Sequence, residues 1–216
     1  MDLALRQQTL GWGERVVLPD VTLEIRKGER VALMGRSGVG KSTLLGALQA
    51  RAAGRAAVVA QDHGLVDALS VFHNVWMGRL ADHGTSRNLR TLVWPNAQER
   101  AAAEAALARV GMDGLQRRMV ASLSGGQRQR VALARAILRG GMAVFADEPV
   151  SALDPAQGDA LLQSLAAKFE TSVMVLHDTG QALGFATRIV GLKAGGIVLD
   201  APVAEVDAAR LMELYG

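Results

Sequence analysis

A glycine-rich loop with a single lysine is the first stretch whose residue types and spacing indicate chemistry. It follows the pattern G-x4-G-K-[ST], which binds nucleotide phosphates when a strand precedes it and a helix follows. Glycines let successive backbone N–H groups point at phosphate oxygens, and the helix N-terminus adds its positive dipole end. We expect Lys41 to reach the β- and γ-phosphates and the Ser42 hydroxyl to ligate Mg²⁺. A plain glycine turn is the alternative. The predicted nucleotide-binding residues are Gly35, Arg36, Ser37, Gly38, Val39, Gly40, Lys41, Ser42 and Thr43.

Two adjacent carboxylates, Asp147 and Glu148, follow the apolar run Met142–Ala146. A strand that ends in two carboxylates places them where open α/β sheets bind their ligands. The first carboxylate is suited to hold a metal ion, directly or through water. The second could polarise an attacking water, which contributes about 10²–10⁴-fold to a rate. An isolated Asp-Glu pair is usually a solvated loop, but the preceding strand and the phosphate loop favour the catalytic interpretation.

A second candidate anion-binding cap lies 80-odd residues after the phosphate loop, in the run Ser124, Gly125, Gly126 and Gln127. Ser124 precedes a predicted helix, so its hydroxyl and the N–H groups that follow can bind an anion. One chain already surrounds the phosphates with the first loop. A second cap is therefore useful if it completes the site of another subunit.

Strand and helix patterns alternate along the chain, which predicts an α/β fold with a largely parallel sheet. The residues around 75–119 differ, because helical spacing there alternates with turn signals, and we interpret them as an inserted helical subdomain. The glycines Gly195-Gly196 predict the turn of a hairpin. The predicted strands are 3–5, 21–25, 31–34, 57–60, 142–146, 172–176, 189–192 and 197–199, and the predicted helices are 42–50, 98–110, 127–138 and 156–169.

Composition excludes several classes of function. The 216 residues contain no cysteine, which excludes disulfides, thiolate catalysis and sulfur-ligated metal sites. The net charge of +3 comes from interspersed charges and gives no support for nucleic-acid binding. No apolar run reaches the roughly 18 residues of a transmembrane helix, and residues 1–6 lack a signal-peptide pattern, so we expect a cytoplasmic protein. His63, His73 and His83 match no metal-ligand spacing.

The pentapeptide Leu123–Gln127, together with the phosphate loop and the carboxylate pair, resembles the signature of ABC-type ATPases. The resemblance covers nearly the whole chain and implies an ATPase with ATP and Mg²⁺. It implies a Mg²⁺-sensing role for Gln61, a D-loop at Ser151–Asp154, a switch histidine at His177 and adenine stacking by Trp12. Taken singly, Gln61 reads as a surface residue, His177 as structural and Trp12 as a packed loop aromatic.

The resemblance also implies the organisation of the chain. It predicts one ABC ATPase domain over residues 1–216, a P-loop NTPase core at 1–74 and 120–216 with a small antiparallel β subdomain, and the helical subdomain at about 75–119. Only 17 residues separate Thr43 from Gln61, fewer than the family usually has, so we expect that β subdomain to be small. The family mechanism implies a homodimer, or a pair with another ABC subunit, closed around two ATP molecules.

Residues 65–80 and 146–155 look most like phosphonate-type importer ATPases. That likeness implies an integral membrane permease, a periplasmic or extracellular binding protein, and a location on the inner face of the membrane. Leu65, Leu69 and Phe72 are candidates for the groove that receives the permease's coupling helix, with ordinary subdomain core as the alternative. Other functions stay open: a lipoprotein-release or efflux ATPase, a soluble ABC ATPase outside transport, or a regulatory nucleotide-binding module.

Overall fold

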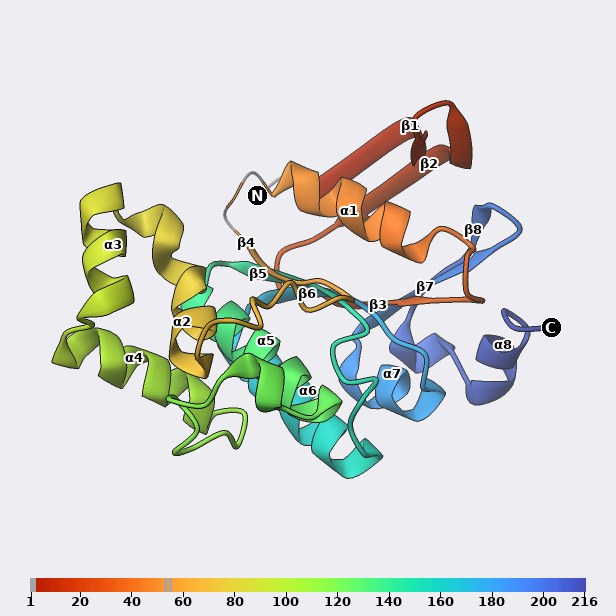
Figure 1. Cartoon of the computed structure of the whole chain (residues 1–216). Coiled ribbons are helices and arrows are strands. Elements are labelled where there is room, and N and C mark those ends of the chain that lie inside the picture. The colour runs from red at the N-terminus through yellow and green to blue at the C-terminus, as the bar shows by residue number, and fades with distance from the viewer. Residues whose placement is uncertain (1–2, 53, 55) are drawn as a thin grey trace.

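The computed structural model describes residues 3–52, 54 and 56–216, and its centre is a six-stranded sheet (Figure 1). The strand order is β4-β5-β6-β3-β7-β8. All neighbouring pairs are parallel except β7 and β8, which form an antiparallel hairpin. The strands are β4 (Ala56–Val59), β5 (Ala143–Asp147), β6 (Thr171–Val175), β3 (Arg30–Met34), β7 (Arg188–Lys193) and β8 (Gly196–Pro202).

A separate two-stranded antiparallel sheet forms the N-terminal part of the chain, from β1 (Leu3–Trp12) and β2 (Arg15–Ile25). Helix α1 (Lys41–Arg51) lies between this sheet and the central one (Figure 1). Alternate residues of β1 and β2 point inward and pack with Leu44 and Leu48 of α1 in one apolar cluster. The mainly parallel sheet and the small antiparallel sheet of the sequence prediction are both present. Met1 and Asp2, which belong to the segment compared with signal peptides, lie outside the described residues.

The opposite face of the central sheet is covered by α5 (Gly125–Arg139), α6 (Pro155–Lys168) and α7 (Thr179–Phe185) (Figure 1). Their apolar faces pack with Met34, Val144 and Met174 of the strands in a second, larger core. The short helix α8 (Ala208–Met212) follows β8 near the C-terminus. Each face of the sheet therefore has its own apolar layer, which fixes the strands rigidly and leaves their ends to form loops.

Three helices extend beyond the β4 edge of the sheet (Figure 1): α2 (Val71–Trp76), α3 (Thr85–Val93) and α4 (Ala97–Ala108). The 3₁₀ turn η1 (Met77–Asp82) lies between α2 and α3, and further single turns are η2 (Val120–Ser122) and η3 (Val203–Glu205). The sequence prediction located only α4 within this stretch. The predicted boundaries of the domain and of its helical insertion stay predictions.

Most predicted elements agree with the structure to within one or two residues, and two details were wrong. The strands near the N-terminus are longer than predicted, since β1 continues to Trp12. The β7–β8 hairpin turns at Ala194 and Gly195, not at Gly195 and Gly196, because the two turn residues have φ of 50° and 78° while Gly196 already belongs to β8. This pair of left-handed residues suits the twist of a tight hairpin.

Candidate nucleotide site

The phosphate loop connects β3 to α1, as the sequence predicts. Gly35 has a φ of 139°, and a Cβ added there would lie 2.3 Å from the carbonyl oxygen of Leu192. Only glycine fits this close approach to the neighbouring strand. Gly40, at the N-cap of α1, has a φ of 112° and leaves the first N–H groups of the helix without a side-chain cap. The start of α1 is thus free to bind an anion.

The Lys41 side chain folds back over this loop and is only 6% exposed. Its Nζ donates to the carbonyl oxygens of Gly35 at 2.7 Å and Arg36 at 2.9 Å. Burial lowers the pKa of Lys41, and the nearby carboxylates of Glu148 and Asp147 act in the opposite direction. A buried ammonium whose present partners are neutral carbonyls can gain much from a phosphate oxygen, because that contact is charge-assisted.

Trp12 lies beside the loop and is 70% exposed. Its indole Nε1 donates to Thr43 Oγ1 at 3.1 Å, which links the end of β1 to the start of α1. A cavity of about 870 Å³ opens between them. Its lining includes Trp12, Arg15, Val16, Val17, Arg36, Ser37, Gly38, Val39, Gly40, Ser42, Thr43, Ala194 and Gly195. An exposed aromatic face over a phosphate loop is suited to stack on a base.

The carboxyl ends of four neighbouring parallel strands bring the remaining predicted catalytic residues to one edge. Leu33 pairs with Val175, Asp147 with Val175, and Val59 with Ala146. The phosphate loop follows β3, and Glu148 directly follows β5. His177 lies two residues after the end of β6, and Gln61 lies two residues after the end of β4. The register therefore gathers at this edge the lysine, both carboxylates, the histidine and Gln61, which is exposed just beyond β4.

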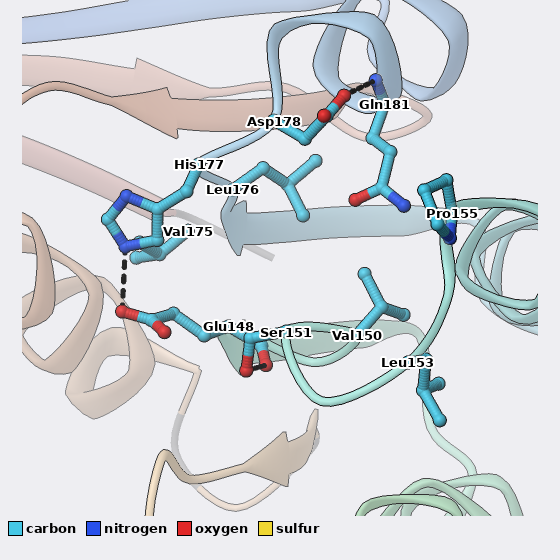
Figure 2. Close-up of a pocket in the computed structure, with 10 residues that line it drawn as sticks. All are labelled: Glu148, Val150, Ser151, Leu153, Pro155, Val175, Leu176, His177, Asp178 and Gln181. Atoms are coloured by element: carbon cyan, nitrogen blue, oxygen red, sulfur yellow. Dashed lines mark hydrogen bonds and ion pairs between the residues drawn. The ribbon is translucent and has the colours of Figure 1, made fainter. Parts of the chain in front are cut away.

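Glu148 and His177 contact each other directly (Figure 2). Glu148 Oε1 lies 2.7 Å from His177 Nε2, and the two line a cavity of about 220 Å³ with Ser151, Asp178 and Gln181. Glu148 has a φ of 51°, a left-handed conformation that a residue with a side chain adopts only when its surroundings enforce it. Such strain is concentrated at functional sites, and here it turns the carboxylate away from the strand toward the histidine.

The Ser124 run begins α5 with reciprocal caps. Gln127 N donates to Ser124 Oγ at 3.3 Å, and Ser124 N donates to Gln127 Oε1 at 3.1 Å. Ser124, Gly126 and Gln127 line a cavity of about 510 Å³ together with Asp154, the N-cap residue of α6. This cavity and the one at the phosphate loop have no lining residue in common. Within one chain, the two helix starts that the sequence predicts to bind anions thus line different cavities.

Gln129 is a residue that the sequence reasoning missed. It is 1% exposed on α5, and its side-chain amide bonds to the turn that follows β5. The available signal was a glutamine on the apolar face of a helix, four and seven residues before the buried Leu133 and Ala136. A buried polar side chain needs partners, so its position implies a bonding role.

Two kinds of feature are absent from the described residues. None of their helices is long and apolar enough to cross a membrane. Residues 3–52, 54 and 56–216 also hold no group of three or more His, Cys, Asp or Glu side chains arranged around a metal.

The fold and the site together define a P-loop nucleotide-binding enzyme, with a phosphate loop, an acidic strand end and a neighbouring histidine. Comparison with known proteins gives the family: the model of the ABC transporter family matches residues 18–151, and the chain belongs to that family. It is an ABC ATPase, the ATP-binding subunit of a transporter.

Two relatives match over almost their whole length. The phosphonates import ATP-binding protein PhnC of Caulobacter vibrioides is 35% identical, over 99% of this chain and 93% of the relative. PhnC 1 of Natronomonas pharaonis is 38% identical, over 99% of both chains. Among solved structures, the dimeric ABC transporter cassette MJ0796 has a TM-score of 0.79 at 26% identity, over 94% of this chain and 99% of the other. A post-hydrolysis dimer of that cassette with ADP and Pi gives the same TM-score at 27% identity, with the same coverage.

Proposed function

We propose that two copies of this chain, or one copy and a paired ABC subunit, close around two ATP molecules and drive a permease that imports phosphonate or a related oxyanion. The observation that carries the dimer is the separation of the two anion-binding helix starts. The Ser124 cap and the phosphate loop line different cavities that share no residue, so we infer that each cap meets the nucleotide bound by the other chain. Head-to-tail pairing of two chains supplies each ATP with both caps. The dimeric structures of the similar cassette MJ0796 support this arrangement.

Hydrolysis is assigned to the sheet edge. Water attacks the γ-phosphorus, the bond from that phosphorus to the bridging oxygen breaks, and ADP and phosphate leave. Glu148 accepts the proton of the attacking water, and His177 orients the carboxylate through their 2.7 Å contact. Lys41 gives up its carbonyl partners for the β- and γ-phosphate oxygens.

The residues also fit a bound Mg²⁺, which would neutralise charge on the phosphates. Ser42 is exposed at the start of α1, and Asp147 ends β5, which β6 separates from β3 in the sheet. Hydroxyl and carboxylate oxygens are the donors that Mg²⁺ prefers. Ser42, Asp147 and Gln61 would hold it.

The permease is assigned to the helical end of the molecule, with the binding protein on the far side of the membrane. Of the predicted groove residues, Leu65 and Leu69 are half-buried and Phe72 is buried. Three large apolar side chains of α3 and the tryptophan that follows it are instead turned to solvent, and an exposed apolar patch marks an interaction surface. They are Leu89, Leu92, Val93 and Trp94. If this chain docks to the permease through that patch, it lies on the inner face of the membrane.

The test uses Glu148→Gln, which keeps the ATP contacts and removes the base. Gel filtration with and without ATP should give an ATP-dependent dimer of the variant and a monomer without nucleotide. The matched control is Glu170→Gln, since Glu170 pairs with Lys27 on the surface. A Glu148→Gln chain that binds ATP and stays monomeric, alone and with its membrane partner, contradicts the dimer.

The transport assignment needs a second experiment. Tagged Glu148→Gln protein is purified with ATP from detergent-solubilised membranes of its native cells, and its partners are identified by mass spectrometry. A polytopic permease with a binding protein encoded beside it supports import, and binding of phosphonates by that protein supports the cargo. A permease of a lipoprotein-release or efflux system, or soluble partners alone, contradicts it.

A further inference from the structure

Gln129 connects the helix that begins at the Ser124 cap to the turn that carries Glu148. Its Nε2 donates to the carbonyl oxygen of Glu148 at 2.8 Å and lies 3.4 Å from Ser151 Oγ. Its Oε1 accepts from the backbone N–H of Ala152 at 3.0 Å. Both ends of one buried amide are therefore bonded to the same five-residue segment, Glu148–Ala152.

Few other contacts hold the strained backbone of Glu148. Its N–H donates to the carbonyl oxygen of Val175 at 3.2 Å, on the neighbouring strand. Its carbonyl oxygen accepts from Gln129 and from two groups of Ser151, the Oγ hydroxyl at 3.2 Å and the backbone N–H at 3.4 Å. Ser151 belongs to the turn itself, so among the described residues Gln129 supplies the hydrogen bond to this carbonyl from outside the turn. A left-handed residue persists only where such bonds enforce it.

The same helix touches the turn at a second point. Gly126, three residues before Gln129, approaches so closely that an added Cβ would lie 3.1 Å from the carbonyl oxygen of Ala152. The first turns of α5 thus contact the segment from Glu148 to Leu153 at both of its ends, through Gln129 at Glu148 and through Gly126 near Ala152. A displacement of α5 at the Ser124 cavity must move this segment with it, because packed elements move as rigid bodies.

We propose that Gln129 is a positioning residue for ATP hydrolysis: it fixes the backbone of Glu148 relative to the signature helix, so that the position of α5 sets the aim of the carboxylate. The inference rests on the proposed role of Glu148 as the base. In the proposed dimer, α5 contacts the ATP of one site while Glu148 of the same chain acts at the other. Gln129 then makes hydrolysis at one site depend on the nucleotide at the second.

The test compares Gln129→Met and Gln129→Glu with the wild-type chain. Methionine keeps the length and removes both polar ends. Glutamate keeps the acceptor for the Ala152 N–H and removes the donor to the Glu148 carbonyl. Gln163→Met is the matched control, since Gln163 is exposed on α6. For each variant we would measure the dissociation constant and stoichiometry of ATP binding, kcat per binding-competent site, and the thermal unfolding midpoint.

We expect kcat to fall about 100-fold in both Gln129 variants, the effect of a misplacement of about 1 Å in a catalytic group. The ATP dissociation constant should stay unchanged, because the phosphate loop and Trp12 are untouched, and Gln163→Met should equal the wild type. Because kcat is counted per site that binds ATP, a partly unfolded preparation cannot imitate this result.

Two results would overturn the proposal: wild-type kcat in either Gln129 variant, or a fall in kcat matched by an equal loss of ATP affinity. Glu148→Gln, assayed in parallel, separates this inference from the proposed function. If Glu148→Gln hydrolyses ATP normally, the assignment of the base is wrong. If it is inactive while Gln129→Met is normal, the base stands and the positioning role is wrong.

Discussion

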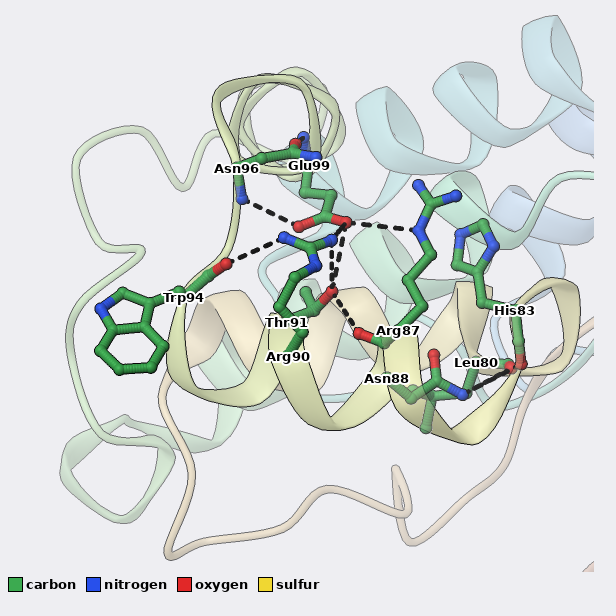
Figure 3. A network of polar contacts seen from close by, with 9 residues as sticks. All are labelled: Leu80, His83, Arg87, Asn88, Arg90, Thr91, Trp94, Asn96 and Glu99. Atoms are coloured by element: carbon green, nitrogen blue, oxygen red, sulfur yellow. Dashed lines mark hydrogen bonds and ion pairs between the residues drawn. The ribbon is translucent and has the colours of Figure 1, made fainter.

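Two polar clusters of this molecule are built in opposite ways, one at the sheet edge and one in the helical end. At the sheet edge, Lys41 donates to backbone carbonyls and the start of α1 has no side-chain cap, which suits both groups to bind a ligand. In the helical end, Glu99 is 1% exposed and has partners at both oxygens (Figure 3). A binding cluster thus differs from a structural one in that its polar groups can still form strong hydrogen bonds to a ligand.

The Glu99 cluster also explains why α3 turns its polar face inward and its large apolar side chains toward solvent. Thr91 Oγ1 donates to Glu99 Oε1 at 3.1 Å, Arg90 donates to the same oxygen, and Arg87 lies 3.5 Å from it. The Asn96 N–H donates to Glu99 Oε2 at 2.9 Å. These bonds turn the polar face of α3 inward (Figure 3), so its leucines and the following Trp94 face solvent. We assign Glu148 at the sheet edge to the reaction, whereas Glu99 holds α3 in the orientation that exposes its apolar side chains.

The largest expected effect breaks the sheet-edge cluster. Lys41→Met removes the buried ammonium and should weaken ATP binding by about 2–5 kcal/mol, since truncating one partner of a desolvated charge pair costs that much. Equilibrium titration with ATP measures it. Lys27→Met, at an exposed pair with Glu170, is the control and should bind ATP normally. Unchanged affinity in Lys41→Met would mean that the lysine is bound to its carbonyls permanently.

The corresponding change in the helical end should act on stability instead. Glu99→Leu leaves Arg87 and Arg90 without their carboxylate, and we expect a loss of about 3 kcal/mol, the lower end for a broken buried pair because both arginines are 40–48% exposed. Denaturant unfolding measures it. ATP affinity should not change, and an equal loss of ATP affinity would contradict the division between the two clusters.

The same cluster predicts a pH dependence. Burial alone would raise the pKa of Glu99, but the bonds from Asn96, Arg90 and Thr91 outweigh it and lower the pKa. A carboxyl with a lowered folded pKa contributes stability above its unfolded pKa of about 4.3 and loses it as the pH falls toward the folded value. The stability difference between wild type and Glu99→Leu should therefore be full at pH 7 and shrink below about pH 4. Denaturant unfolding at a series of pH values measures it, and a difference that grows on acidification would contradict this sign.

The two clusters also differ in how far the sequence predicts them. The phosphate loop, Asp147, Glu148 and His177 all follow apolar strands, and a parallel sheet necessarily brings such strand ends together. The contacts of Glu99 with Arg87, Arg90 and Thr91 carry no comparable signal, because these partners come from a helix whose apolar side chains face outward, against the usual pattern. Gln129 was missed for a related reason: the bonds of a single buried amide depend on tertiary packing. The sequence thus predicted the parallel sheet and the residues at its edge, but not the contacts that hold them.

The two most exposed tryptophans allow a smaller test. Trp12→Ala should weaken ATP binding by about 1–3 kcal/mol if the indole stacks on adenine, by analogy with base–aromatic stacking. Trp94→Ala is the matched control, because Trp94 is 75% exposed at the opposite end of the molecule and should leave ATP affinity unchanged. Equal behaviour of the two variants in an ATP titration would argue that Trp12 serves only to hold Thr43.

The smallest effect compares two helix caps of the same kind. Ser124 caps α5 and Asn96 caps α4, and each forms a reciprocal capping box with the third residue of its helix. Replacing either by alanine should cost about 1 kcal/mol of stability, the usual value of such a cap. If Ser124 also meets the partner's ATP, Ser124→Ala should in addition lower kcat, while Asn96→Ala should lose stability alone. Unfolding and turnover measured on both variants decide this, because a cap with a purely structural role predicts the same pair of values at both helices.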